Sequence, residues 1–140
     1  MALMTRYSAV ASYRTVSVHG DVESASPHRL IELMMDGALD RIASAAGSLA
    51  RGEIGLKGES VSKAINLIEG LRASLDHSRG APVVANLDAL YEYMARRLLE
   101  SNLHNDGAGF DEVSRLLREI RDAWHAIPAD VQERPQEHLR

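Results

Sequence analysis

The stretch SPHRLIELMMDGAL (residues 26–39) decides the fold, because it begins a helix and places apolar residues on most sides of that helix. Ser26 can accept a hydrogen bond from a free N–H at the helix start, and Pro27 suits the first turn. At about 100° per residue, the apolar side chains from Leu30 to Ile42 sweep an arc of roughly 240°. A helix on the outside of a small bundle needs an apolar stripe only somewhat wider than about 100°. The apolar arc is thus wider than a bundle helix needs. The additional apolar surface predicts contact with a further apolar partner, within this chain or on another.

An acidic stripe interrupts this arc. Glu32, Asp36 and Asp40 follow one another at intervals of four residues, which places them on one side of the helix. A solvated face is the simplest interpretation of such a stripe. Contact with Lys or Arg residues of a partner is the alternative.

The composition limits the class of protein. With 140 residues, of which 45% are apolar and 26% charged, the chain predicts a single globular domain. The net charge is −4 and no basic block stands out, which disfavours a nucleic-acid partner. The chain has no cysteine, so disulfides and thiolate chemistry are excluded. No apolar run reaches the length of a signal peptide or a membrane span, so we expect a cytoplasmic protein without membrane insertion.

Four helical patterns follow one another, each with apolar residues at intervals of three and four. We expect helices over residues 27–50, 56–77, 82–104 and 110–127. The breaks between them contain glycine or proline and are short enough to make neighbouring helices antiparallel. The sequence therefore predicts an all-α fold, an antiparallel up-down four-helix bundle that spans residues 26–127. Residues 128–140 are polar with two prolines and predict a frayed C-terminal tail.

Residues 1–25 form a separate N-terminal segment. Its apolar residues show no sustained helical stripe, and VSV (16–18) alternates as an extended chain does. We expect an extended or short helical segment that packs on the bundle over the surplus apolar face. It could act as a lid that yields to a partner, or as a permanently docked strand. The residues expected to form this lid are Tyr7, Val10, Tyr13, Val16 and Val18.

Five pieces of the chain, spread over nearly all of residues 7–127, carry a family resemblance. They are YRTVSV (13–18), ASPHRLIELMMDGAL (25–39), KGESVSKAINLIEGLRASLD (57–76), ANLDALYEYMARRLLESNLHND (85–106) and DEVSRLLREIRDAW (111–124). The most specific part is NLDALYEYMARRLLESN, since a generic amphipathic helix would not need Asn, Tyr and paired Arg at those places. On these residues the chain resembles the flagellin-specific export chaperones of bacterial flagella, the FliS family. It departs from the family pattern at Met35, where an aromatic residue is common, and at Gly80-Ala81, where Gly-Gly is common.

The resemblance implies a fold and a role. Members of that family are antiparallel helical bundles that bind the C-terminal segment of newly made flagellin in the cytoplasm. They prevent premature polymerisation and help present flagellin to the flagellar type III export gate. The resemblance also implies that the N-terminal segment can lie on the bundle and shift when the client binds. Export-gate components, other flagellar regulators and a second copy of the chain, in a weak homo-oligomer, are the further partners to expect.

Binding of such a client should depend on buried apolar area. An amphipathic client helix would place Leu and Ile side chains in a groove, and burying each contributes roughly 1.5–3 kcal/mol. Several anchors together exceed the cost of about 2–5 kcal/mol for ordering a disordered segment. Each apolar residue taken alone is more simply explained by core packing. The residues expected to form the client-binding groove are Leu30, Leu33, Met34, Gly37, Leu67, Leu71, Tyr93, Leu99 and Leu103.

Two other classes of protein suit a bundle of this size. A histidine phosphotransfer module needs an accessible histidine near a cation, and His77 with Arg79 offers that combination, although a partner for the helix dipole is the simpler interpretation of His77. A structural helical oligomer without a client would also use a wide apolar face. Metal-ligand spacings and common catalytic motifs do not occur in the chain, so we expect no enzyme, no metal and no cofactor.

Overall fold

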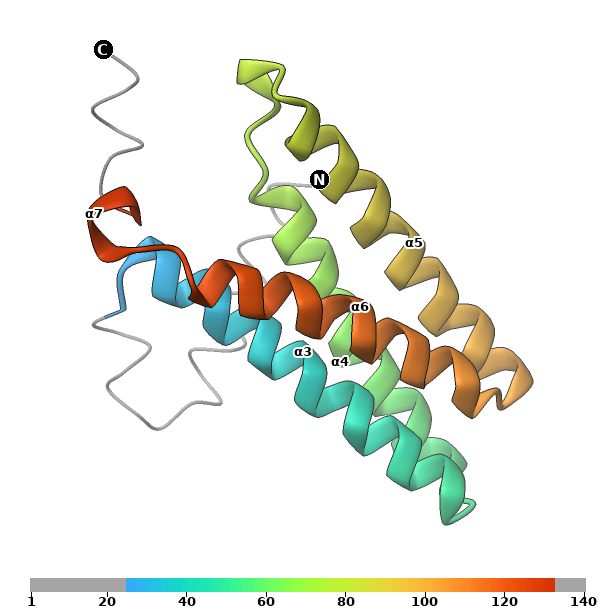
Figure 1. Ribbon diagram of the computed structural model, residues 1–140. Helices are drawn as coiled ribbons and strands as arrows, with labels where there is room; N and C mark the ends of the chain where they lie inside the picture. The colour runs from blue at the N-terminus through green and yellow to red at the C-terminus, as the bar shows by residue number, and fades with distance from the viewer. Residues whose placement is uncertain (1–24, 133–140) are drawn as a thin grey trace.

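The chain folds into four long helices. The structure is a computed structural model that describes residues 25–132. Helices α3 and α5 each pack against both α4 and α6, and the described residues contain no strand (Figure 1). This arrangement confirms the predicted all-α four-helix bundle. The elements are α3 (Pro27–Ala50), α4 (Ile54–Ala73), a 3-10 helix (His77–Arg79), α5 (Pro82–His104), α6 (Gly107–His125) and the short α7 (Ala129–Gln132).

The start of α3 agrees with the sequence-based expectation in its atomic detail. Ser26 Oγ accepts a hydrogen bond from the Arg29 backbone N–H at 3.1 Å, and Pro27 is the first helical residue. Both features satisfy or remove donors that a helix start leaves without partners. The observed bounds of α3 and α5 match the predicted ranges.

The bounds of α4 and α6 differ from the predicted ranges for local reasons. Helix α4 ends at Ala73, and His77 belongs to a separate 3-10 helix, in which the Ser78 backbone N–H donates to Asp76 Oδ1 at 3.0 Å. Helix α6 begins earlier than expected, because Asp106 Oδ1 accepts a hydrogen bond from the Ala108 N–H at 3.1 Å. The glycines among residues 105–109 predict a break between helices, whereas Asp106 in that stretch caps the start of α6.

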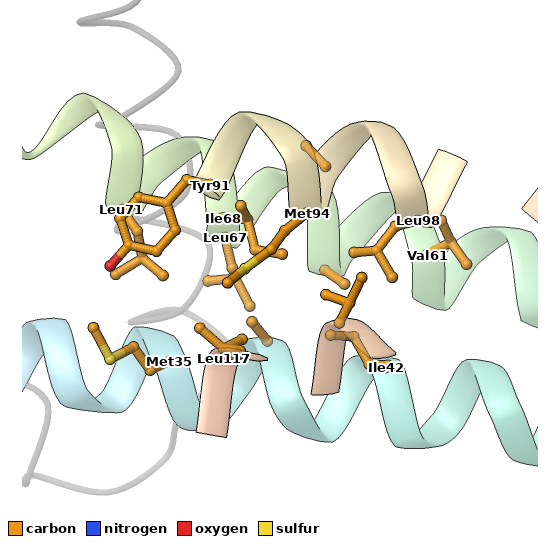
Figure 2. Packing of buried hydrophobic residues seen from close by; sticks show 14 of the residues in the cluster. Met35, Ile42, Val61, Leu67, Ile68, Leu71, Tyr91, Met94, Leu98 and Leu117 are labelled. Atoms are coloured by element: carbon orange, nitrogen blue, oxygen red, sulfur yellow. The ribbon is translucent and has the colours of Figure 1, made fainter. Parts of the chain in front are cut away.

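The core lies between all four long helices. Its two ends can be followed in Figure 2, where Met35 lies across from Leu71 and Tyr91 at one end. Ile42 lies near Leu98 at the other end. Burial raises the pKa of the Tyr91 hydroxyl to about 12. Aliphatic side chains fill most of this interior, in keeping with the small number of aromatic residues.

Two contacts bring the end of α5 close to its neighbours. Lys57, near the start of α4, is 3% exposed, and its Nζ donates to the Asn102 carbonyl at 2.9 Å and to the Asn105 side chain. On the other side of α5, Gly109 of α6 lies so close to Ser101 that an added Cβ would be 1.7 Å from its Oγ. The start of α4, the end of α5 and the start of α6 therefore meet at one end of the bundle.

Several expectations concern residues that the structure does not describe. The N-terminal segment that was expected to pack on the bundle lies outside residues 25–132, apart from Ala25. The same holds for its proposed lid residues Tyr7, Val10, Tyr13, Val16 and Val18. Within the stretch expected to be a C-terminal tail, the helix α7 is described, and residues 133–140 are not.

Candidate functional site

Helix α3 buries apolar side chains on opposite faces. Leu33 precedes Ile42 by nine residues, which at about 100° per residue places the two side chains on opposite sides of the helix. Both are buried, with 8% of Leu33 and 1% of Ile42 exposed. On the side of Leu33, Gly37 is also buried and Leu30 is half-buried. These three residues, Leu30, Leu33 and Gly37, form what we name the α3 face.

Three other residues expected in the groove belong to the bundle core. Met34 and Leu71 are each 1% exposed, and Leu67 is 7% exposed. All three are members of the contiguous apolar cluster that joins the four helices. In this conformation their side chains pack against the interior of the bundle.

An exposed apolar patch lies where the start of α4 meets the end of α5. Leu99 and Leu103 are 51% and 69% exposed, and they are one helical turn apart on α5. The hydrogen bonds of Lys57 to the end of α5 bring the start of α4 to the same place. Ile54, three residues before Lys57, is 55% exposed there. We name Ile54, Leu99 and Leu103 the α4–α5 patch.

Tyr93 lies on yet another side of α5, in contact with α6. Its hydroxyl donates to Glu112 Oε2 at 2.6 Å, and Arg97 Nε donates to Glu112 Oε1 at 2.9 Å. The hydrogen bond to Glu112 raises the pKa of Tyr93, and the same bond, together with that from Arg97, lowers the pKa of Glu112. Tyr93 therefore helps to hold α5 and α6 together.

The expected groove residues thus do not form one continuous groove in this structure. The α3 face lies near the start of α3, at the end of the core marked by Met35 and Leu71. The α4–α5 patch lies at the other end, beyond Leu98. The α4–α5 patch is exposed, whereas the residues of the α3 face are buried or half-buried, and core residues separate the two places.

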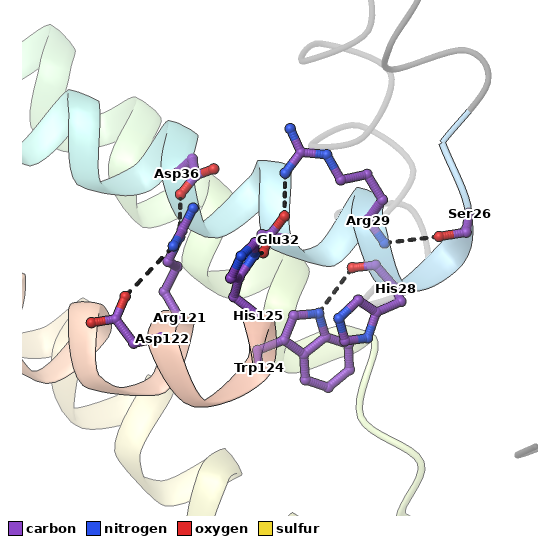
Figure 3. Close-up of polar contacts among 9 residues, drawn as sticks. All are labelled: Ser26, His28, Arg29, Glu32, Asp36, Arg121, Asp122, Trp124 and His125. Carbon is purple, nitrogen blue, oxygen red and sulfur yellow. Dashed lines mark hydrogen bonds and ion pairs between the residues drawn. The ribbon is translucent and has the colours of Figure 1, made fainter. Parts of the chain in front are cut away.

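The acidic stripe of α3 is engaged with α6 rather than solvated along its whole length (Figure 3). Glu32 is 3% exposed and pairs with Arg29 of its own helix and with His125 of α6. Asp36 Oδ1 accepts a hydrogen bond from Arg121 Nε at 2.8 Å. Burial opposes ionisation of Glu32, yet its hydrogen bonds with His125 and Arg29 outweigh that effect, and its pKa is lowered from the ordinary value of 4.5.

The first turn of α3 is also fixed to the end of α6 by an aromatic contact. The rings of His28 and Trp124 stack at a centroid distance of 4.5 Å with an interplanar angle of 7°. The indole N–H of Trp124 donates to the His28 carbonyl at 2.9 Å (Figure 3). Sequence patterns did not indicate these cross-helix contacts, because their partners are separated by more than 80 residues. One sequence feature could have indicated the ion pairs. Arg121 and His125 lie on the last turns of α6, and an antiparallel α3 would place its acidic stripe opposite them.

The surroundings of His77 bear on the phosphotransfer alternative. His77 Nε2 lies 4.0 Å from the carboxylate of Asp88, and that negative neighbour would repel a phosphoryl group. Within residues 25–132 no group of three or more His, Asp or Glu side chains is arranged to hold a metal ion. None of the helices in that range has the length and apolar character needed to cross a membrane.

Comparison with known proteins identifies the family. The model of the family described as "Flagellar protein FliS" matches residues 9–131. Flagellar secretion chaperone FliSB of Pseudomonas aeruginosa is 47% identical over 124 residues, which cover 89% of this chain and 98% of that protein. Flagellar secretion chaperone FliS of Salmonella typhimurium is 47% identical over 121 residues, 86% of this chain and 90% of that protein. The Bacillus subtilis protein of the same name is 32% identical over 127 residues, 90% of this chain and 94% of that protein. The chain therefore belongs to the FliS family of flagellar secretion chaperones.

Proposed function

We propose that this protein binds the C-terminal segment of flagellin in the bacterial cytoplasm, prevents its premature polymerisation and assists its type III export. Membership in the FliS family supports a role in flagellar secretion. The observation that carries the proposal is the pair of exposed leucines, Leu99 and Leu103, one helical turn apart at the end of α5. Large apolar side chains grouped at the surface are typical of a protein-binding site.

The proposed mechanism is burial of apolar area without a chemical step. A disordered client segment would form an amphipathic helix whose Leu and Ile side chains pack on the α4–α5 patch. Each buried anchor contributes roughly 1.5–3 kcal/mol, so a few anchors offset the cost of ordering the segment, about 2–5 kcal/mol. A client that is extended enough could continue along α4 to the α3 face at the other end of the bundle.

The N-terminal segment has a place in this proposal. We propose that residues 1–25, with Tyr7, Val10, Tyr13, Val16 and Val18, cover the α3 face and yield to the client. The core residues Met34, Leu67 and Leu71 would then support the binding surface from below. Contacts with the export gate and with other flagellar regulators belong to the same proposal, as steps that follow client capture.

A titration with a flagellin C-terminal peptide tests the proposal. Leu99→Ser combined with Leu103→Ser removes the exposed anchors and leaves the core intact, so the folded state should persist by circular dichroism. We expect the affinity measured by calorimetry to fall at least tenfold, because two apolar contacts are lost. Val83→Ser is a matched control, since Val83 is also exposed, at 60%, near the opposite end of α5. If the double variant and the control both bind the peptide as tightly as the wild type does, a role for the α4–α5 patch is refuted.

The two alternative functions make different predictions in solution. A structural oligomer would keep its mass in light scattering when the flagellin peptide is added, whereas a client chaperone should form a defined heterocomplex. A phosphotransfer module would take up label from a phosphorylated receiver domain at His77. The nearby Asp88 carboxylate gives no support to that chemistry.

A further inference from the structure

The contact between α3 and α6 is closed near the start of α3 and near its end, with a hollow between. Near the start of α3, Glu32 and Asp36 are joined to His125 and Arg121 of α6. Farther along α3, Ala43 and Ala46 are too small to reach α6, whereas Leu49 beyond them lies 3.7 Å from the position of a Cβ on Gly107. The two helices also separate in this direction (Figure 1). The result is an open groove of about 750 Å³ between the two helices.

This α3–α6 groove has an apolar lining and a charged rim. The buried Ile42 and Phe110 lie deepest in it, and Ala43 and Ala46 of α3 with Ala108 of α6 line it nearer the surface. Asp111, Arg115 and Arg118 of α6 line the rim, and all three are exposed. A hollow over alanines leaves room for a large side chain that the protein itself does not supply.

The two arginines of the rim have no ion pair within the described part of the chain. Asp111 precedes Arg115 by four residues, but the pair that this spacing favours is not formed. Arg121, one helical turn after Arg118, is by contrast bound to Asp36. A guanidinium group makes its strongest pairs with carboxylates, often through two parallel hydrogen bonds. With Asp111, the rim carries two guanidinium groups and one carboxylate, an excess of one positive charge in a chain whose net charge is −4.

We propose that the α3–α6 groove binds an acidic amphipathic helix of a second protein. A bulky apolar side chain of that helix fills the hollow over Ala43, Ala46 and Ala108, and its flanking carboxylates pair with Arg115 and Arg118. The spacing of these arginines, three residues apart on one helix, matches carboxylates spaced by three or four residues on an adjacent helix. The groove shares no residue with the α3 face or the α4–α5 patch, so the chaperone can hold this partner and its client at the same time.

Two stapled helical peptides are suitable probes. The first carries leucines along one face with glutamates beside them, and in the second every glutamate is replaced by glutamine. Fluorescence anisotropy with the full chain should give at least tenfold tighter binding of the glutamate peptide. A glutamine peptide that binds equally well would overturn the proposed pairing with the arginines.

Two variants test the charge and the shape of the groove separately. Arg115→Glu with Arg118→Glu reverses the rim, and Ala43→Leu fills the hollow without changing the charge. Each should weaken binding of the glutamate peptide at least tenfold, and binding of the flagellin peptide should stay within twofold of the wild type. Because the three residues are exposed, the fold should be retained, which circular dichroism verifies.

A matched control separates local pairing from overall charge. Lys63→Glu with Arg96→Glu makes the same change in net charge at two exposed positions on α4 and α5. This control should bind the glutamate peptide within about twofold of the wild type, apart from long-range screening effects. An equal loss in the control and in the rim variant would overturn the proposal.

A second copy of this chain is the alternative occupant of the groove, and the oligomeric state of the peptide-free protein tests for it. We expect Ala43→Leu to leave the sedimentation profile of the peptide-free protein unchanged. A dimer of the wild type that disappears in Ala43→Leu would assign the groove to a second copy of this chain and would overturn the proposal of an acidic partner.

Discussion

Gly109 is a single residue on which the approach of two helices depends. Its missing side chain allows α6 to lie against Ser101 of α5, where the Ser101 hydroxyl donates to the Arg97 carbonyl at 2.7 Å. Ser101 is fully buried, so it has no open space into which it could move. Glycine here serves close packing, and its backbone torsion is not in the left-handed region.

Substitution of this glycine gives a prediction for stability. Gly109→Ala would place a Cβ 1.7 Å from Ser101 Oγ and 2.9 Å from Ser101 Cβ, so α5 and α6 must separate. We expect a loss of about 1–3 kcal/mol in the free energy of unfolding, as for other overpacked interiors, measured by urea denaturation.

Gly58 is the matched control for Gly109. It lies inside α4, and an added Cβ would meet no atom within 4 Å. Gly58→Ala should therefore stabilise the protein by about 0.5–1 kcal/mol through helix propensity alone. If Gly109→Ala were as stable as Gly58→Ala, the close contact between α5 and α6 would be refuted.

At the scale of elements, α3 and α6 are joined where one begins and the other ends. Ion pairs of Glu32 and Asp36 and the stacking of His28 on Trp124 all lie within this region. Glu32 is the most buried acidic side chain among these contacts, and a buried carboxylate is stable only when it is paired. The attachment of the first turns of α3 therefore depends on α6.

The pKa of Glu32 makes this attachment sensitive to acid. Its pKa in the folded state lies below the ordinary value of 4.5, so the ionised carboxylate stabilises the fold above about pH 4.5. This contribution is lost as the pH falls through the lowered pKa. We expect Glu32→Gln to reduce the free energy of unfolding by about 1–3 kcal/mol at pH 6, and the difference from the wild type to shrink towards pH 3.

Urea denaturation at several pH values checks this expectation, with Glu119→Gln as a control at an exposed position of α6. The control should stay within about 0.5 kcal/mol of the wild type at every pH, as surface substitutions usually do. A Glu32→Gln effect that is the same at pH 6 and pH 3 would contradict the role of the ionised carboxylate.

At the scale of the whole molecule, the expected groove residues outside the core cluster lie at two ends of the bundle, buried or half-buried on the α3 face and exposed on the α4–α5 patch. A short client helix could contact the α3 face or the α4–α5 patch, but a long disordered segment could reach both. Such a distribution suits a client that folds on the chaperone and gains its affinity from several separate contacts.

Deletion of residues 2–18 tests the proposed lid at this scale. If the N-terminal segment covers the α3 face, its removal should expose apolar surface, increase the fluorescence of a hydrophobic dye and change the affinity for the flagellin peptide in calorimetry. Unchanged affinity together with unchanged dye binding would count against the lid. The full-length protein, with the same peptide, is the reference for both measurements.

Much of the fold follows from local properties of the chain. Apolar periodicity places all four long helices, and the cap at Ser26 with Pro27 defines where α3 begins. The same periodicity indicated that α3 carries more apolar perimeter than one core requires, and both Leu33 and Ile42 are indeed buried on opposite sides. These features depend on residues close together in sequence, so a single stretch is enough to predict them.

The division of the expected groove residues depends on tertiary contacts. Periodicity could not show that Leu71 packs in the core while Leu103 is exposed, because both occupy apolar positions on amphipathic helices. Nor could it show that the acidic stripe of α3 meets Arg121 and His125 of α6, or that the α3–α6 groove lies beside Ala43. Local spacing states which residues share a side of one helix. Which side meets a neighbour, and how closely, is determined by how four helices pack together around one interior.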